Sequence, residues 1–206
     1  ERLYAWPNER DSAIAAKIPD NPWIGTAPAF LIFLANGRRQ PLISNLRGKP
    51  FPNDHLDLFF NAAVDSAIVL ATFMRAAAAV GLGSCPISAI RDRADEVSAL
   101  LELPERGIPV SGSCLAWPAE AGYITARLGL DTTLHEDRYS AGDVAQKIDA
   151  YDRRRDLRWP YRRQRAPERW GTATFYGWSE DKARQYAGAL RADLGALVPG
   201  KGFPPE

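Results

Sequence analysis

The stretch from residue 54 to residue 89, DHLDLFFNAAVDSAIVLATFMRAAAAVGLGSCPISA, decides the fold. Between residues 58 and 80 polar side chains are scattered instead of forming one face, so the long helix predicted here should be covered on most sides. Asn53 or Asp54 is expected to cap its start. Gly81 is expected to end it, because glycine accepts the left-handed conformation that closes a helix. A buried strand should follow.

A membrane-spanning helix is the alternative for this stretch, because its length is near the ~20 residues that a span needs. Asp65 and Arg75 lie inside it, and charged side chains are costly in lipid. No basic flank or aromatic belt marks either end. A buried helix of a globular protein is therefore the favoured interpretation.

Composition is that of an ordinary globular chain, with 206 residues, 46% hydrophobic and 25% charged. The formal net charge of +1 argues against bulk attraction to nucleic acid or acidic membranes. Cys85 and Cys114 both fall in predicted buried strands, so we expect core residues and no disulfide framework. Nothing resembles a signal peptide, which predicts a cytoplasmic location.

Helices and strands alternate without a regular βαβ period, which favours an α+β three-layer arrangement over a doubly wound sheet. Capping residues are expected at Asp92, Ser140 with Asp143, and Ser179. The predicted elements are strands at 3–6, 27–35, 84–90 and 108–117, helices at 9–18, 94–101, from 144 and 180–190, and a loop over 36–52.

Few side chains are suited to acid, base or metal chemistry. His55 and His135 are the two histidines, and neither lies in a G-x-S-x-G context, so hydrolase catalysis is disfavoured. Cysteines and histidines are not clustered at metal-ligand spacing, and no phosphate-binding glycine loop is present. An enzyme with so few candidates is still active where a cofactor carries the reaction.

A family resemblance supplies such a cofactor. Residues 64–120, VDSAIVLATFMRAAAAVGLGSCPISAIRDRADEVSALLELPERGIPVSGSCLAWPAE, resemble the core of the FMN-dependent nitroreductase and NAD(P)H:flavin oxidoreductase family. The matching features are an Ala-rich helix ending in GLG, a strand of the G-G-I/L-R type, a helix closing on an LGLP-like motif and a P-x-x-G-x-C-L-G-x-P-like strand. The likeness continues through TARLGLDTTLHEDRY, YGWSEDKARQY and KGF, and is greatest to the larger NADPH-preferring branch.

The resemblance implies a nitroreductase-like three-layer α-β-α fold, with a central, mostly antiparallel sheet and a long buried central helix. It implies a single domain over 1–206, with a basic C-terminal extension from 153 to 206 that carries the last helix. The family's R-S-x-R phosphate-binding arm and its Ser/Asn-rich flavin loop are not among these residues and would precede Glu1.

Site residues follow from the same resemblance, position by position. Asn21 stands where a glutamine bonds the flavin pyrimidine, and Arg127 where an arginine holds the FMN phosphate, which a guanidinium can bind bidentately. No side chain is implied as an obligate acid or base. The implied cofactor-binding residues are Asn21, Pro86, Ile87, Ser88, Ala89 and Arg127, and those for the 2′-phosphate of NADPH are Arg153, Arg154, Arg155 and Arg158.

The implied function is an FMN-dependent oxidoreductase that works as an intertwined homodimer. It would pass hydride from NADPH or NADH through flavin to nitroaromatics, quinones or free flavin by a ping-pong mechanism, without nucleic acid or membrane partners. Three departures motivate an alternative, a flavin-free binding or assembly protein of this fold: Ser88-Ala89 replaces Gly-Gly, Thr125 replaces a lysine, and the phosphate-binding arm is not among these residues. A flavin dehydrogenase of a specific metabolite is a further alternative.

Overall fold

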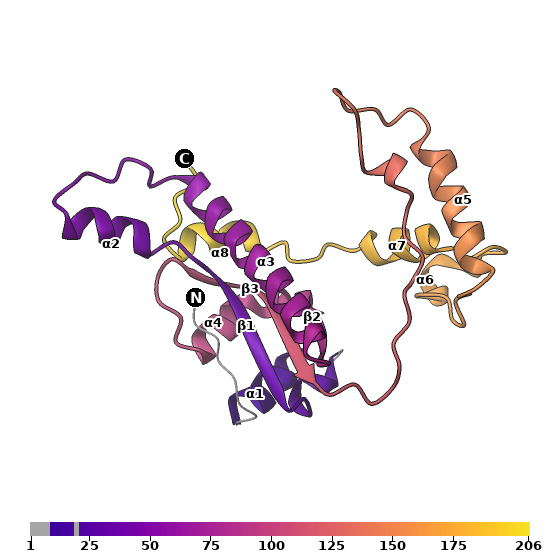
Figure 1. The fold of residues 1–206 in the computed structure, drawn as a ribbon, viewed down its shortest axis with the longest axis horizontal. Coiled ribbons are helices and arrows are strands. Elements are labelled where there is room, and N and C mark those ends of the chain that lie inside the picture. The colour runs from indigo at the N-terminus through magenta and orange to yellow at the C-terminus, as the bar shows by residue number, and fades with distance from the viewer. Residues whose placement is uncertain (1–8, 19–20) are drawn as a thin grey trace. The chain divides into compact units, whose positions relative to one another are not determined.

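The structure is a computed structural model that describes residues 9–18 and 21–206. The predicted strand at 3–6 lies outside the described residues. The chain divides into two compact units, unit 1 with residues 1–121 and 191–206, and unit 2 with residues 122–190 (Figure 1). Each unit is described by itself, and the expectation of one domain stays a prediction.

Unit 1 is built on an antiparallel sheet of three strands in the order β1-β3-β2. They are β1 (Ala29–Asn36), β2 (Gly83–Ile87) and β3 (Gly107–Ala116). The apolar runs at 27–35 and 108–117 were predicted as strands, and both predictions are confirmed. The predicted strand at 84–90 ends earlier, at Ile87, because the chain turns there into the 3-10 helix η2 (Ser88–Arg93).

Helices cover both faces of this sheet. Phe30 and Ile32 of β1 lie in one apolar cluster with Ile14 of α1 (Glu9–Lys17) and Val97 of α4 (Ala94–Leu100). Phe33, on the other face, packs edge-on against Phe73 of α3 (Leu56–Ala79), with ring centroids 5.8 Å apart. Because successive strand residues point to opposite faces, the sheet lies between two helical layers. The α+β three-layer prediction is confirmed.

The long central helix α3 begins with a different cap from the predicted ones. His55 is its N-cap, and the Nδ1 atom accepts a hydrogen bond from the Asp57 amide at 3.3 Å. Asp54 instead forms an ion pair with Arg106 at 2.6 Å, so the acidic side chain is engaged elsewhere. The predicted glycine end is confirmed, since α3 stops at Ala79 and Gly81 has a φ of +83°.

The expectation that α3 is covered on most sides is wrong for this chain. Of its 24 residues, the buried ones are Leu58, Ala62, Ser66 and Ala77. By length and composition α3 could also cross a membrane, which is weak evidence because helices of soluble cores pass the same test. Its contact with β1 through Phe73 assigns it to the sheet unit. The other face exposes Leu56, Phe60, Val64 and Ile68.

Close packing requires glycine at two positions of unit 1, Gly112 in β3 and Gly37 directly after β1. A Cβ atom at Gly112 of β3 would overlap the ring of Phe30 on the facing strand. Phe203, near the C-terminus, is fully buried and packs with Leu58 of α3 and against Gly37, where a Cβ atom would lie 2.5 Å from the ring. Both glycines therefore leave room for an aromatic ring.

Shorter elements complete unit 1. The predicted loop at 36–52 contains the helix α2 (Arg39–Leu46), which buries none of its residues. Asp92 does not cap α4; it pairs with Arg191, and Arg93 is the N-cap. The remaining elements are η1 (Pro22–Gly25) and α8 (Leu194–Gly200).

Unit 2 contains η3 (Leu130–Thr132), α5 (Val144–Asp156), α6 (Pro167–Trp170) and α7 (Trp178–Tyr186). Tyr151 of α5 packs edge-on against Trp178 of α7 at 5.4 Å. The predicted caps differ here too. Asp143 is the N-cap of α5 but pairs with Lys147 instead of the backbone. Gly177 is the N-cap of α7, and Ser179 donates to the buried carboxylate of Asp152.

Candidate functional site

The predicted ring-binding residues lie where β2 ends and η2 begins. Pro86 and Ser88 are exposed, whereas Ile87 is buried in the apolar core and Ala89 packs partly against it. Cys85, beside them, is also exposed, so the prediction that it is a core residue is wrong, while Cys114 is buried as predicted. β2 lies at one edge of the described sheet, which explains the exposure. The strand end is therefore exposed at Pro86 and Ser88, and the next residue, Ala89, has only a methyl side chain.

Two arginines at this strand end were missed by the sequence analysis. Arg191 donates from Nη2 to the Ser88 hydroxyl at 3.3 Å and pairs through Nε with Asp92 at 2.6 Å. Arg91 donates to the carbonyl of Val110. Burial lowers the Arg91 pKa, the charge of Arg191 lowers it further, and Asp92 raises it. Arg91 ends the G-G-I/L-R-like motif and could have been named, but no local signal pointed to Arg191.

Asn21 belongs to the same unit as this strand end. It precedes η1, and its backbone donates to Ile18 and accepts from Ile24. Within the described part of the chain, no hydrogen bond or ion pair joins Asn21 to residues 86–89. The structure therefore places Asn21 and the strand end in one unit without a hydrogen bond or ion pair between them among the described residues.

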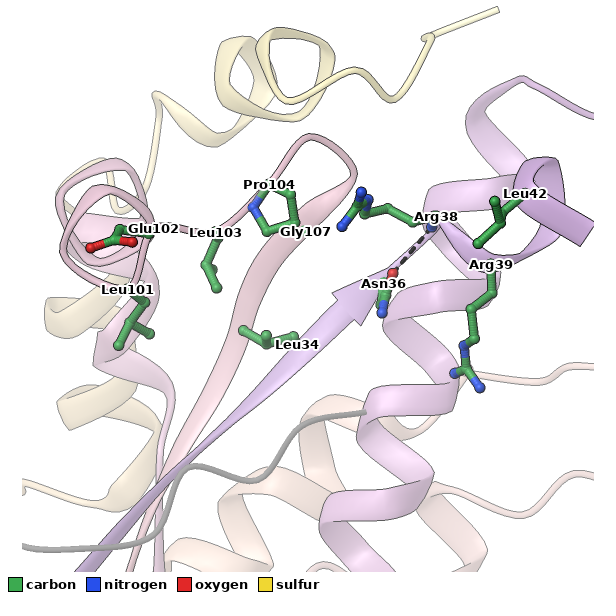
Figure 2. Close-up of a pocket in the computed structure, with 10 residues that line it drawn as sticks. All are labelled: Leu34, Asn36, Arg38, Arg39, Leu42, Leu101, Glu102, Leu103, Pro104 and Gly107. Carbon is green, nitrogen blue, oxygen red and sulfur yellow. Dashed lines mark hydrogen bonds between the residues drawn. The ribbon is translucent and has the colours of Figure 1, made fainter.

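Unit 1 also has a pocket of about 550 Å³ between the end of β1, the start of α2 and the loop after α4 (Figure 2). In Figure 2 the Arg38 side chain reaches toward Pro104 and Gly107, and its amide donates to Asn36 Oδ1 at 3.1 Å. The predicted flavin residues are not among those that line it. The lining residues are Leu34, Asn36, Arg38, Arg39, Leu42, Leu101, Glu102, Leu103, Pro104 and Gly107.

Unit 2 has a pocket of about 600 Å³ that brings together two of the predicted site residues, Arg127 and Arg155. Lys182 of α7 adds a third cation. Three aromatic side chains, Tyr151, Tyr161 and Trp178, form much of the remaining wall. The other lining residues are Thr125, Ala126, Leu128, Leu130 and Thr133. We call this space the Arg127 pocket.

Side chains of α5 hold the backbone on which Arg127 stands. The Tyr151 hydroxyl donates to the Ala126 carbonyl at 3.0 Å, and Arg154 Nη2 donates to the Arg127 carbonyl at 2.8 Å. These two hydrogen bonds reach consecutive carbonyls. The segment that carries Arg127 is thus fixed on α5, although it has no regular secondary structure.

The other two cations of the Arg127 pocket are held by neighbours. Arg155 lies over the Tyr161 ring, 4.2 Å from its centroid, and donates to the Trp159 carbonyl at 2.8 Å. Lys182 Nζ lies 2.7 Å from Gln185 Oε1 and 3.5 Å from Asp181 Oδ2. These contacts position the cationic groups of Arg155 and Lys182, which both line the pocket.

Arg153 and Arg158, the other predicted 2′-phosphate residues, are exposed and do not line this pocket. Arg158 lies over the Trp159 ring at 4.8 Å. The four arginines predicted as one group therefore divide into two pairs: Arg154 and Arg155 engage residues around Arg127, and Arg153 and Arg158 face solvent.

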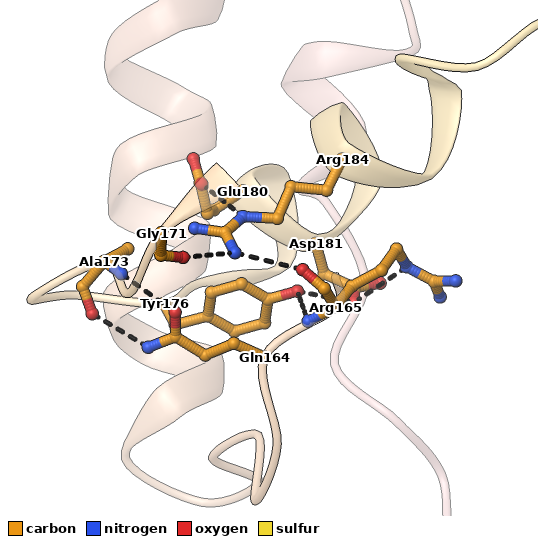
Figure 3. A network of polar contacts seen from close by, with 8 residues as sticks. All are labelled: Gln164, Arg165, Gly171, Ala173, Tyr176, Glu180, Asp181 and Arg184. Carbon is orange, nitrogen blue, oxygen red and sulfur yellow. Dashed lines mark hydrogen bonds and ion pairs between the residues drawn. The ribbon is translucent and has the colours of Figure 1, made fainter. Parts of the chain in front are cut away.

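A buried polar network closes the loop between α5 and α7 (Figure 3). Arg184 donates to the carbonyls of Arg165 and Gly171 at 3.0 and 2.9 Å, and pairs with Glu180 at 2.7 Å. Tyr176 donates to Asp181 at 3.0 Å and accepts from the Arg165 amide at 2.8 Å. Burial raises the Tyr176 pKa. The network fixes α7, and with it the position of Lys182.

Comparison with known proteins gives consistent matches over both units. The model of the nitroreductase family matches residues 6–117, and that of the nitroreductase family C-terminal domain matches residues 126–206. An FMN reductase (NAD(P)H) of Bacillus subtilis is 34% identical over 147 residues, which are 70% of this chain and 59% of that protein. The chain therefore aligns with less than two thirds of that relative.

Two further comparisons cover almost the whole chain. The NADPH-flavin oxidoreductase of Vibrio harveyi is 26% identical over 196 residues, 95% of this chain and 77% of that protein. The solved structure of NfrA2 from B. megaterium is 28% identical, with a TM-score of 0.85, over 100% of this chain and 81% of that one.

Proposed function

The chain belongs to the nitroreductase family, and from this membership we propose that it is an FMN-dependent oxidoreductase that takes hydride from NADPH or NADH. The proposal includes a nitroaromatic, a quinone or free flavin as electron acceptor, a ping-pong order and a cytoplasmic location. Relatives named FMN reductase and NADPH-flavin oxidoreductase support it. The structural observation that carries it is the Arg127 pocket, where cations and aromatic rings line one space.

FMN has a phosphate dianion and a flat ring, and each unit, taken by itself, has residues that suit one of these two groups. The Arg127 pocket supplies a guanidinium that can bind phosphate bidentately. In unit 1 the end of β2 exposes Pro86 and Ser88 next to Ala89, whose methyl group adds little bulk. Asn21 is proposed for the flavin pyrimidine and residues 86–89 for the ring. FMN, when bound, supplies hydride transfer, which the side chains of this chain do not.

Titration of the purified protein with FMN tests the proposal. We expect the fluorescence of free FMN to be quenched as it binds, and the absorbance of the bound flavin to be bleached by NADPH or NADH without oxygen. A protein that leaves FMN fluorescence unchanged at micromolar concentration would contradict it.

A flavin-free binding or assembly protein is the second candidate, and the Ser88 side chain favours it. The Ser88 hydroxyl accepts from Arg191 at the position where the family has a glycine against the flavin. The substitution Ser88→Gly separates the two candidates. If Ser88 excludes the ring, Ser88→Gly gains flavin binding that the unchanged protein lacks.

The 2′-phosphate of NADPH is proposed to bind the exposed guanidinium groups of Arg153 and Arg158. We expect the double substitution Arg153→Glu, Arg158→Glu to raise the KM for NADPH about tenfold or more, because two attractions become repulsions. The KM for NADH should change much less. Equal changes for the two nucleotides would remove these residues from the 2′-phosphate site.

A homodimer is proposed because α3 exposes an apolar stripe to which a second copy could bind. Leu56, Phe60, Val64 and Ile68 recur every four residues and are 40 to 63% exposed. A stripe of this kind marks an interaction surface. We expect Phe60→Glu to weaken the dimer at least about tenfold in analytical ultracentrifugation. Ala99→Glu, at an exposed position of α4, is the matched control, and a Phe60→Glu protein that dimerises as tightly as this control would disprove the contact.

A further inference from the structure

The Arg127 pocket contains more positive charge than the sequence analysis assigned to it. Arg127 comes from the segment before η3, Arg155 from α5 and Lys182 from α7. These residues are 28 and 27 positions apart along the chain, counted between 127, 155 and 182. Three cations from three elements line one pocket, and no carboxylate is among its lining residues, which favours an anion of high charge density.

We infer that Arg155 and Lys182 bind the FMN phosphate together with Arg127. This inference rests on the proposed FMN function and deepens it, since it names the residues that recognise the phosphate. It also assigns Arg155 to the flavin and removes it from the group predicted for NADPH. Thr125 lines the same pocket and carries no charge, so these two cations supply the charge that residue 125 lacks.

The geometry prepares the pocket before any ligand binds. Tyr151 and Arg154 bond the carbonyls of Ala126 and Arg127, which fixes the backbone under the Arg127 side chain. The Tyr161 ring holds Arg155 in place. Preorganised cations lose little conformational freedom on binding, so more of their attraction for a phosphate is kept.

Lys182 keeps hydrogen-bond donors that are available to bind a phosphate. Its ammonium has three donors, and one of them is used by Gln185 at 2.7 Å. Its carboxylate neighbour, Asp181, is itself bonded to Tyr176 and Arg165. The Asp181 charge is thus shared with the buried network, and Lys182 can contribute its charge to the pocket.

Riboflavin provides the test, because it carries the same ring as FMN but no phosphate. The Kd values of both are measured by fluorescence quenching for the unchanged protein and for Arg127→Gln, Arg155→Gln and Lys182→Gln. We expect each substitution to raise the Kd for FMN about tenfold and to leave that for riboflavin within about twofold. Arg138→Gln removes one exposed charge from the same unit and is the matched control.

A rescue sharpens the test. Thr125→Lys in the Lys182→Gln background places an ammonium on the same pocket wall, and it should restore most of the FMN affinity. Arg155→Gln should leave the ratio of KM values for NADPH and NADH unchanged. Melting curves identify any variant that fails to fold, and Arg155→Met or Lys182→Met, which also removes the charge, then takes the place of that variant.

The outcomes separate the inference from the proposed function. If FMN binds and only Arg127→Gln lowers the preference for FMN over riboflavin, the inference is wrong and the function stands. If Arg155→Gln changes NADPH selectivity but not FMN affinity, Arg155 binds the nucleotide and the inference is wrong. If neither flavin binds the unchanged protein, both fail.

Discussion

Unit 1 and unit 2 are held together by different kinds of contact. Unit 1 buries aliphatic and aromatic side chains such as Phe30, Ile90 and Ile108, each 2% exposed or less. In the described unit 2 the buried side chains are Tyr151, Tyr176, Asp152, Asp181 and Arg184, all of which carry polar groups. Apolar side chains form the interior of unit 1, whereas polar and charged side chains that form hydrogen bonds make up the interior of unit 2.

The difference has consequences for function. Apolar packing is tolerant of direction, whereas a buried charge must meet its partners with good geometry. Unit 2 therefore fixes loop segments precisely without forming a large core. That suits a unit whose proposed task is to place three cations around one phosphate.

The largest expected effect is at the C-terminal part of unit 1. Phe203→Ala removes a fully buried ring between Leu58 and Gly37 and leaves a cavity. We expect a loss of about 3–5 kcal/mol in the free energy of unfolding of unit 1, measured by denaturant titration. Exchange protection of backbone amides within unit 2 should persist. A loss confined to unit 2 would contradict the division into apolar and polar units.

A smaller effect is expected from the centre of the polar network. Arg184→Met keeps an unbranched apolar stem but removes the guanidinium and leaves the carbonyls of Arg165 and Gly171 without their donor. We expect unit 2 to lose about 2–3 kcal/mol, since hydrogen bonds to charged groups are strong when buried. Hydrogen exchange should quicken in residues 160–186. Unchanged exchange there would mean that apolar contacts hold unit 2 after all.

Removal of one hydroxyl should have a still smaller effect. Tyr176→Phe deletes the bond to Asp181 and the acceptor of the Arg165 amide, at a cost of about 1–2 kcal/mol. Because burial raises the Tyr176 pKa, its contribution is full below pH 10 and falls as pH rises above 10, where the unfolded chain ionises first. The stability gap between the two proteins should therefore narrow above pH 10. A gap that widens would reverse the sign.

The smallest effect is expected for exposed charges of unit 2. Lys147 pairs with Asp131 and Asp143, and these bonds raise its pKa. Water screens such pairs, so Lys147→Ala should leave the melting temperature of unit 2 unchanged within error. A clear drop would show that surface pairs as well as buried ones hold this unit.

Sequence patterns predicted the parts of the fold that depend on local apolar runs. Strands β1 and β3 and helix α3 are such runs, and each was found within two residues of its expected start. Helix α2 was missed because it lies in a stretch rich in glycine and proline and buries nothing. The cap at Ser179 was wrong because the Asp152 carboxylate, 27 residues earlier, binds that serine.

The candidate site was predictable only in part, for a similar reason. The resemblance located the end of β2 and Arg127, because motifs are local. Lys182 had no local signal, since a single lysine in a helix is an ordinary surface residue. Lys182 becomes a site candidate only because α7 places it in the pocket that Arg127 also lines, and contacts between distant parts of the chain determine that placement.

The ring of Phe30 lies where a side chain at position 112 would have to be. A mutation from Gly112 to alanine should therefore be harmful alone and tolerated once position 30 has become a smaller aliphatic residue. Descendants of this chain can reach that pair of substitutions only in one order, first at 30 and then at 112. The evolutionary histories of the two positions are thus coupled across the strand pair.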